Sequence, residues 1–530
     1  MRKKTFRYPA RKLRSKLVLE HLSVKLIVGL SIIISIVVTL HCYQNHYIIA
    51  YGDAESHLNI AKRVIQGLTP GAAQLGGVWL PLPHLLMVPQ VFSDWLWKTG
   101  LAGTVVSAIA FIFSSITIYK IAMLLSQKRL FAFGAALVFM LNPNILYLQA
   151  TPMSELPLIC FFLLNTYFFI KFIQDRNETL SLILAAFFGF LSSLSRYDGW
   201  ILVVLEVIII FSLLLKERKP AKEIEGKIIL FSSLAFFGIF LWLAWNWLIF
   251  NDPLFFNRSQ FSARAQQMAW SARGELPAYH NLKISIFYYL VTSVNNVGIL
   301  IFSFAALGLI FFLFNQKESN RLPIALILGV PFIFYISSLF FGQSVIFTPE
   351  LTPETFEWQL FNVRYGVMAV PACAIFFSYA FFYLYRRTRL SLILAIVFLT
   401  GQTLFYLLGY SNIITLVDGT VGLSAAKKVD AQEWLNQNYD DGLVLLDDYA
   451  RAMSIIRTPI PMKNVIYIGT KPYWEESLRE PEKYATWIIM QRHDEVWTHL
   501  YENQEQLARV YKYFNKVYTS DEILIFKRIN

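Results

Sequence analysis

Residues 24–43 read VKLIVGLSIIISIVVTLHCY, an apolar run of the length that a membrane-spanning helix needs. The first 25 residues carry nine Lys or Arg and one acid, Glu20. A basic tail beside an apolar run is typical of the cytoplasmic flank of a membrane helix. The end of the run, TLHC at 39–42, offers neither a small-residue cleavage site nor a lipoprotein signal. The sequence therefore predicts an uncleaved anchor with a cytoplasmic N-terminus.

The composition extends this interpretation to most of the 530 residues. Hydrophobic residues make up 56% of the chain and charged residues only 15%, whereas a soluble surface needs about a quarter or more charged residues. Disorder, collagen and coiled coil are excluded on the same ground. The net charge is +12, but its position beside apolar runs indicates membrane flanks and not nucleic-acid binding. All three cysteines lie in or beside apolar runs, which argues against disulfides or a cysteine metal site.

Eleven apolar runs are long enough, or nearly so, to form membrane helices. They are 24–43, 101–125, 130–149, 154–173, 179–195, 200–215, 228–250, 286–314, 322–342, 365–385 and 390–409. With the N-terminus inside, most Lys and Arg of the connecting segments fall on the cytoplasmic side, as in 216–227. The odd number of spans then places the C-terminal part outside. We predict a multi-pass α-helical protein of the plasma (inner) membrane with about 11 spans.

The predicted domains are a basic cytoplasmic tail (1–23), a transmembrane domain (24–409) with a long first external loop (44–100), and an extracytoplasmic domain (410–530). The last domain alternates helical stretches with short apolar runs, which is typical of a small α/β domain. The expected helices are 425–438 and 494–502, and the apolar runs are 443–446, 465–468, 487–490 and 522–526.

The first external loop begins with YGDAESH at 51–57, which places Asp53 and Glu55 just beyond the first span. A carboxylate near the lipid boundary is costly to ionise unless it is paired. Each acid is therefore either a base with a tuned pKa or a salt-bridge partner. Both acids also suit the start of a helix near Ser56, because acids favour a helix N-terminus. The residues alone leave capping and catalysis open.

Five short elements lie in order at the external ends of predicted spans. They are the Asp53/Glu55 pair, TPMSE at 151–155, SRYDGW at 195–200, NDPL at 251–254 and NVRYG at 362–366. Their order and shared placement resemble the GT-C superfamily of membrane glycosyltransferases, specifically the family 39 or protein-mannosyltransferase-like group. The resemblance covers about residues 50–410 and implies a GT-C-like fold.

The resemblance implies transfer of one sugar from a polyprenyl-phosphate donor to an acceptor hydroxyl outside the cytoplasm. The family-based expectation for the sugar is a hexose such as mannose. An acid in the first external loop is the usual catalytic position, and Asp53 matches it, with Glu55 as its alternate or metal-side partner. The base accepts the proton of the acceptor hydroxyl. No cofactor is required, and a divalent ion held by the oxygens of the two acids is left open.

The phosphate of the donor requires positive groups, and arginine binds phosphate bidentately. Arg196 and Arg364 each open an external span end, and each is followed by a tyrosine. We expect these two arginines to clamp the lipid phosphate. The further binding residues expected there are Tyr197 and Tyr365, with Arg258 and Arg264 as loop reserves.

Each of these polar residues also has a plainer interpretation. Glu155 suits a helix start, Arg196 suits an ion pair with Asp198, and Arg364 suits an interfacial anchor. Glu206, which lies deep in a span, is expected to hydrogen-bond a neighbouring helix. The loop histidines His57 and His84 are expected to be satisfied by loop partners and not to bind metal.

Three other classes of protein remain open. A secondary transporter would favour repeated halves and broken helices with midplane sites, and the sequence shows no matching halves. An envelope glycan polymerase or ligase would use the same carrier lipid but join whole oligosaccharides. A membrane scaffold would not need the clustered external acids and arginines. The acceptor is left open as protein, lipid or glycan.

Overall fold

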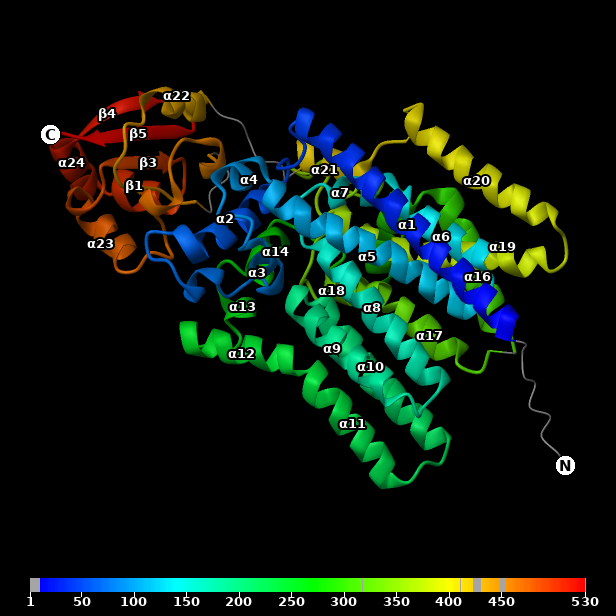
Figure 1. Cartoon of the computed structure of the whole chain (residues 1–530). Helices are drawn as coiled ribbons and strands as arrows, with labels where there is room; N and C mark the ends of the chain where they lie inside the picture. The colour runs from blue at the N-terminus through cyan, green and yellow to red at the C-terminus, as the bar shows by residue number, and fades with distance from the viewer. Residues whose placement is uncertain (1–9, 317, 410, 423–429, 449–452, 530) are drawn as a thin grey trace, which may run out of the picture.

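The computed structural model describes residues 10–316, 318–409, 411–422, 430–448 and 453–529. It consists of a helix bundle with a small sheet domain at one end (Figure 1). By length and composition, six described helices are long and apolar enough to cross a membrane, and the number rises to ten if each of four bent helix pairs is counted as one span. A shorter apolar helix supplies an eleventh run. The predicted polytopic fold with its small C-terminal strand domain is confirmed.

The single spans and the bent pairs correspond in order to the eleven predicted runs. The single helices are α1 (Ala10–Gln44), α5 (Leu101–Ser126), α8 (Glu155–Gln174), α9 (Thr179–Ser195), α10 (Asp198–Lys216), η2 with α19 (Val363–Ala369, Val370–Tyr385) and α20 (Leu390–Leu407). The pairs are α6/α7 (Arg129–Met140, Pro143–Gln149), α11/α12 (Ala221–Ala235, Phe237–Phe250), α15/α16 (Leu282–Val297, Ile299–Phe314) and α17/α18 (Arg321–Leu328, Val330–Phe340).

Two of the bends can be traced to particular residues. Between α6 and α7, the side chain of Asn142 accepts a hydrogen bond from the amide of Ile145 at 3.0 Å, and Pro143 starts the new helix. Between α15 and α16 the axis turns by 113° at Gly298, whose φ is 88°. A Cβ at Gly298 would overlap the amide of Gln402. Only glycine meets both the dihedral and the space at this corner.

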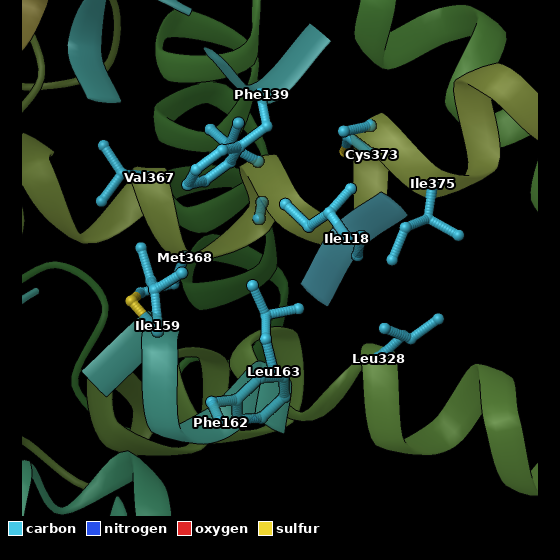
Figure 2. Packing of buried hydrophobic residues seen from close by; sticks show 14 of the residues in the cluster. Ile118, Phe139, Ile159, Phe162, Leu163, Leu328, Val367, Met368, Cys373 and Ile375 are labelled. Carbon is cyan, nitrogen blue, oxygen red and sulfur yellow. The ribbon is translucent and has the colours of Figure 1, made fainter. Parts of the chain in front are cut away.

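The centre of the bundle is formed by α19, with 83% of its span buried, whereas only 11% of the α20 span is buried. α16 packs closely against α19, because Gly308 brings its backbone near the carbonyl of Phe376. Figure 2 shows the apolar packing from α5, α6, α8, α17, η2 and α19. The labelled side chains there include Phe139, Leu163 and Met368. This rigid centre fixes the helix ends that carry the polar residues.

The loop after α1, residues 44–100, is largely helical and lies between the bundle and the sheet domain (Figure 1). Its helices are α2 (Gly52–Gln66), η1 (Ala72–Leu75), α3 (Leu82–Met87) and α4 (Asp94–Thr99). Leu58 and Trp97 of this loop share one hydrophobic cluster with Leu435 and Ile455 of the sheet domain. The loop is therefore part of the contact surface of the sheet domain. Two short helices, α13 (Phe255–Arg258) and α14 (Ala263–Ala272), lie in the loop after α12.

The sheet has the strand order β2-β1-β3-β5-β4. β1 pairs in parallel with β2 and β3, and β5 runs antiparallel to β3 and β4. The strands are β1 (Val444–Leu445), β2 (Val465–Ile466), β3 (Trp487–Gln491), β4 (Phe514–Thr519) and β5 (Ile523–Arg528). The surrounding helices are α22 (Asp430–Asn438), η3 (Ile455–Arg457), η4 (Met462–Asn464), α23 (Tyr473–Arg479), η5 (Pro481–Lys483), η6 (Trp497–Tyr501) and α24 (Gln504–Tyr513).

The four predicted apolar runs of this domain overlap β1, β2, β3 and β5, of which β3 and β5 extend beyond the predicted ends. β4 was not predicted, because only Phe514 at its start is fully buried. The expected helix at 425–438 is present as α22, and residues 425–429 lie outside the described residues. A further helix, α21 (Ile414–Val421), packs against α7 and η2 of the bundle. The domain boundary at residue 410 stays a prediction.

Candidate functional site

Two arginines from distant parts of the chain, the buried Arg364 and the partly buried Arg196, meet at one carboxylate. Nε of Arg364 donates to Oε1 of Glu155 at 3.2 Å, and Nη1 of Arg196 donates to the same oxygen at 3.1 Å. Arg364 lies in η2, Arg196 joins α9 to α10, and Glu155 is the first residue of α8. Glu155 is fully buried, so the two guanidinium groups, and not water, stabilise its carboxylate. The bundle therefore brings the two predicted phosphate-binding arginines together.

Asp53 joins the same network through Arg364. Nη2 of Arg364 donates to Oδ2 of Asp53 at 2.6 Å. The side chain of Asp53 is 22% exposed, whereas that of Arg364 is 4% exposed. Asp53 lies in the first turn of α2, the helix-start position that the sequence also predicted. The structure thus places the predicted base at the accessible edge of a buried ionic network.

Tyrosine rings enclose the two arginines. The guanidinium carbons of Arg196 and Arg364 lie 5.1 Å and 5.2 Å from the ring centre of Tyr365. Tyr335 stacks on Tyr365 at 5.0 Å, and its hydroxyl accepts a hydrogen bond from Nη2 of Arg196 at 3.0 Å. Tyr51 lies 5.1 Å from Arg364 on another side. These cation–π contacts fix both guanidinium planes in a site with little water.

Two further acids complete the network. Asp198 pairs with Nε of Arg196 at 3.4 Å, as the plainer interpretation of that residue predicted. Asp418 of α21 lies 3.9 Å from Nη1 of Arg364 and accepts a hydrogen bond from the hydroxyl of Tyr51 at 3.3 Å. Burial raises the pKa of Asp418 to about 7, and the charge of Arg364 opposes this rise.

Asp418 was missed because it follows the last predicted span. One signal for it exists in the sequence. It is the only acid in the otherwise apolar stretch 413–421. An acid within an apolar helix is a candidate for a paired or functional role.

Glu55 does not share the site of Asp53. Its carboxylate accepts hydrogen bonds from Nε of Arg457 at 2.8 Å and from the hydroxyl of Ser454, both in the sheet domain. Burial raises the pKa of Glu55, and Arg457 opposes this rise. Two residues that are two positions apart on a helix point to nearly opposite faces. The expectation that Glu55 stands beside Asp53, as its alternate or on one metal ion, is therefore not matched by the geometry.

The arrangement of His, Cys, Asp and Glu side chains bears on the divalent ion that the sequence left open. Within the described ranges, no group of three or more His, Cys, Asp or Glu side chains is arranged to hold a metal ion. The carboxylates around Arg196 and Arg364 instead have arginine partners.

Tyr197 and Arg258 form their side-chain hydrogen bonds with residues other than Arg196 and Arg364. The hydroxyl of Tyr197 donates to the carbonyl of Val78 at 2.7 Å and accepts from Nε1 of Trp242 at 3.2 Å. It therefore holds the first loop against α12. Arg258 pairs with Asp252 at 3.3 Å and is 63% exposed. Arg264 is also exposed.

His57 and His84 form a buried pair, with Nδ1 of His57 2.8 Å from Nε2 of His84. Burial lowers the pKa of His57 to about 4 and also lowers the pKa of His84. Both rings are therefore neutral near pH 7, and one donates to the other. The two histidines thus bond to each other within the first loop, whereas the buried Nδ1 of His84 has no hydrogen-bond partner among the described residues. Glu206 accepts a hydrogen bond from Asn165 of the neighbouring α8 at 3.0 Å, which was predicted.

The chain matches, over residues 90–245, the family model described as dolichyl-phosphate-mannose-protein mannosyltransferase. Its structure is similar to that of ArnT from Cupriavidus metallidurans at 12% sequence identity, covering 96% of this chain and 98% of that chain. The TM-score is 0.57 for ArnT in the apo state and 0.55 for ArnT bound to undecaprenyl phosphate.

A second similar structure is the Archaeoglobus fulgidus oligosaccharyltransferase in complex with Zn and sulfate, at 10% identity and a TM-score of 0.52. That similarity covers 95% of this chain and 73% of the other. None of the curated proteins matches this sequence. The family model agrees with the resemblance stated from the sequence over residues 90–245, and the similar structures confirm it at the level of the fold.

Proposed function

We propose that this chain, which has the fold of the GT-C superfamily of membrane glycosyltransferases, transfers a sugar from a polyprenyl-phosphate carrier to an acceptor hydroxyl. The family description names a dolichyl-phosphate mannose donor, and ArnT is seen bound to undecaprenyl phosphate. A hexose such as mannose is the sugar we propose. The reaction lies on the non-cytoplasmic side, with the N-terminus in the cytoplasm and the sheet domain outside.

One observation carries this proposal: Asp53 and the two arginines belong to a single network joined by Glu155. Glycosyl transfer from a lipid phosphate needs a base near the acceptor and cations near the leaving phosphate. Asp53 is the accessible carboxylate, and it lies 2.6 Å from Nη2 of Arg364. The site thus combines an accessible base with preorganised positive charge.

The proposed step is a single displacement at the anomeric carbon. The acceptor oxygen forms its bond to this carbon while the bond from the carbon to the phosphate oxygen breaks, so the configuration inverts. The proton of the acceptor hydroxyl moves to Asp53. The bond's electron pair leaves with the lipid phosphate, whose charge is stabilised by Arg196 and Arg364.

The phosphate enters a network that already contains several carboxylates. Asp418, with a pKa of about 7, is able to hold a proton while the phosphate is bound. Protonation of Asp418 lowers the negative charge beside Arg364, so that this arginine attracts the phosphate more strongly. Asp418 therefore acts as a positioning residue for Arg364 in this proposal.

The test uses the purified full-length protein and a panel of polyprenyl-phosphate sugars, with release of the lipid phosphate as the readout. We expect release with the wild type and a loss of about a hundredfold or more in Asp53→Asn. The matched control is Asp440→Asn, a surface acid of the sheet domain, which should keep full activity. Equal release by wild type and Asp53→Asn would overturn the assigned base. Solute uptake into proteoliposomes without any release would overturn the transferase and favour a transporter.

A further inference from the structure

A cavity of about 500 Å³ lies where α1 ends, and none of the side chains of the proposed site lines it. Its lining comes from three parts of the chain: the end of α1 with the segment after it, the end of α4, and η3 of the sheet domain. The lining residues are Tyr43, Gln44, His46, Ile48, Ile49, Lys98, Thr99 and Arg457. The volume falls in the range of small-ligand sites, about 300–1,000 Å³.

The lining is basic. Lys98, Arg457 and His46 face the cavity, and no acid is among its lining residues, all of which the structure describes. The ammonium of Lys98 donates to the carbonyl of Thr458 at 3.0 Å, a neutral partner. Asp94, one helical turn before Lys98, forms its ion pair with Lys62 and acts on Lys98 without a direct salt bridge. Lys98 therefore brings positive charge to the cavity wall that a bound anion would balance.

Arg457 is held at the cavity wall by two bonds. Its Nε pairs with Glu55 and its Nη2 donates to the carbonyl of Ile49 at 2.9 Å. These bonds involve two of its nitrogens and not Nη1. The guanidinium is thus preoriented, which lowers the entropy cost of binding an anion.

The surroundings of the cavity indicate a lipid. The α1 span is only 17% buried, so most of its surface faces lipid up to the turn that lines the cavity. Apolar side chains near this end are exposed, among them Leu40 and Trp95. Trp95 and Tyr43 lie 6.4 Å apart, and such aromatic side chains are typical of the level of lipid headgroups. A lipid with its chains along α1 would place its headgroup at the cavity.

We propose that this cavity binds the phosphate headgroup of an anionic membrane lipid from the leaflet in which α1 ends, with Lys98 as the main charge partner. The lipid is a structural ligand at the junction of the bundle, the first loop and the sheet domain, and it is distinct from the lipid carrier of the proposed reaction. Its headgroup contacts the arginine that holds Glu55. The inference stands on the cavity and its charges and does not require the proposed function.

The experiment titrates the delipidated full-length protein with phosphatidylglycerol or phosphatidylcholine of identical acyl chains and counts bound lipids by native mass spectrometry. We expect one phosphatidylglycerol molecule to bind about tenfold more tightly than phosphatidylcholine, because it keeps a net negative charge. Lys98→Gln should remove this preference, and Lys98→Arg should keep it. Lys516→Gln, which removes one exposed charge of the sheet domain, is the matched control and should bind like the wild type.

A second variant tests the cavity without removing a charge. Thr99→Trp fills the space and should weaken phosphatidylglycerol binding about tenfold, even if Lys98→Gln fails to fold. The proposal is overturned if Thr99→Trp and any folded Lys98→Gln bind the lipid like the wild type, or if the two lipids bind equally well. It is also overturned if inorganic phosphate at millimolar concentration displaces the lipid, because the site would then recognise a free anion.

Discussion

Asp53 and Glu55 are separated by one residue on α2, yet arginines from different parts of the chain hold their carboxylates. Asp53 lies 2.6 Å from Arg364 of the bundle, and Glu55 lies 2.8 Å from Arg457 of the sheet domain. A helix turns by about 100° per residue, so these side chains point in nearly opposite directions. One acid belongs to the proposed site, and the other belongs to the contact with the sheet domain.

Arg364→Lys is expected to lower sugar transfer by about a hundredfold or more. Arg364 reaches Asp53, Glu155 and Asp418 with three different nitrogens, and the single ammonium of lysine cannot reproduce this planar arrangement. Release of lipid phosphate is the measurement, and the elution volume in size-exclusion chromatography checks folding. Arg258→Lys is the matched control. A monodisperse Arg364→Lys protein with full activity would remove Arg364 from the phosphate site.

Glu155→Gln is expected to destabilise the protein by about 3 kcal/mol. The substitution leaves the guanidinium groups of the buried Arg364 and the partly buried Arg196 without their shared negative partner. The melting temperature, followed by tryptophan fluorescence in detergent, should fall clearly. Glu178→Gln is the control, because Glu178 is a surface acid that pairs with Lys171. An unchanged melting temperature for Glu155→Gln would mean that the two arginines do not depend on this carboxylate.

Donor binding is expected to weaken as the pH rises through 7. Asp418, with its pKa of about 7, is mostly protonated below this pH and ionised above it. The added negative charge beside Arg364 then opposes the donor phosphate. A phosphodiester donor has no second acidic proton, so its own charge stays constant, and its affinity is measured between pH 5.5 and 8.5. Asp418→Asn should bind without this pH step, and a step that persists in the variant would assign it to another group.

The protein is expected to lose stability as the pH falls from about 6.5 to about 4. The pKa of His57 is about 4 in the folded protein against an ordinary 6.5, so the unfolded chain binds more protons in this interval. Acid therefore favours unfolding of the segment that contains His57 and His84. Limited proteolysis of residues 44–100 at several pH values is the measurement. His57→Gln should show a smaller pH dependence, whereas the control His499→Gln, a surface change, should behave like the wild type.

The spans were predictable because the length and apolarity of a membrane helix are local properties of the sequence. The 113° turn at Gly298 was not, since the residue that packs against this glycine, Gln402, lies far along the chain. The convergence of Asp53, Arg196 and Arg364 was expected only through the family resemblance.

Other parts of the site were less accessible to sequence reasoning. Glu155 was taken as a helix start, because nothing local shows that two arginines share it. Glu55 was grouped with Asp53, because the two acids lie two residues apart just beyond the first span. The helix in fact begins at Gly52 and separates the two acids. The partner of Asp418 could not be predicted, because it depends on the packing of α21 against η2 of the bundle.

One helix, α2, carries both the proposed base Asp53 and Glu55, which contacts the sheet domain. If α2 rotated far enough to break the ion pair of Asp53 with Arg364, the same rotation would break the ion pair of Glu55 with Arg457. The contact of the sheet domain with α2 and the position of Asp53 beside Arg364 therefore depend on the same helix, and a rotation of this helix would change both. A one-residue insertion in α2 between these acids would disturb both at once.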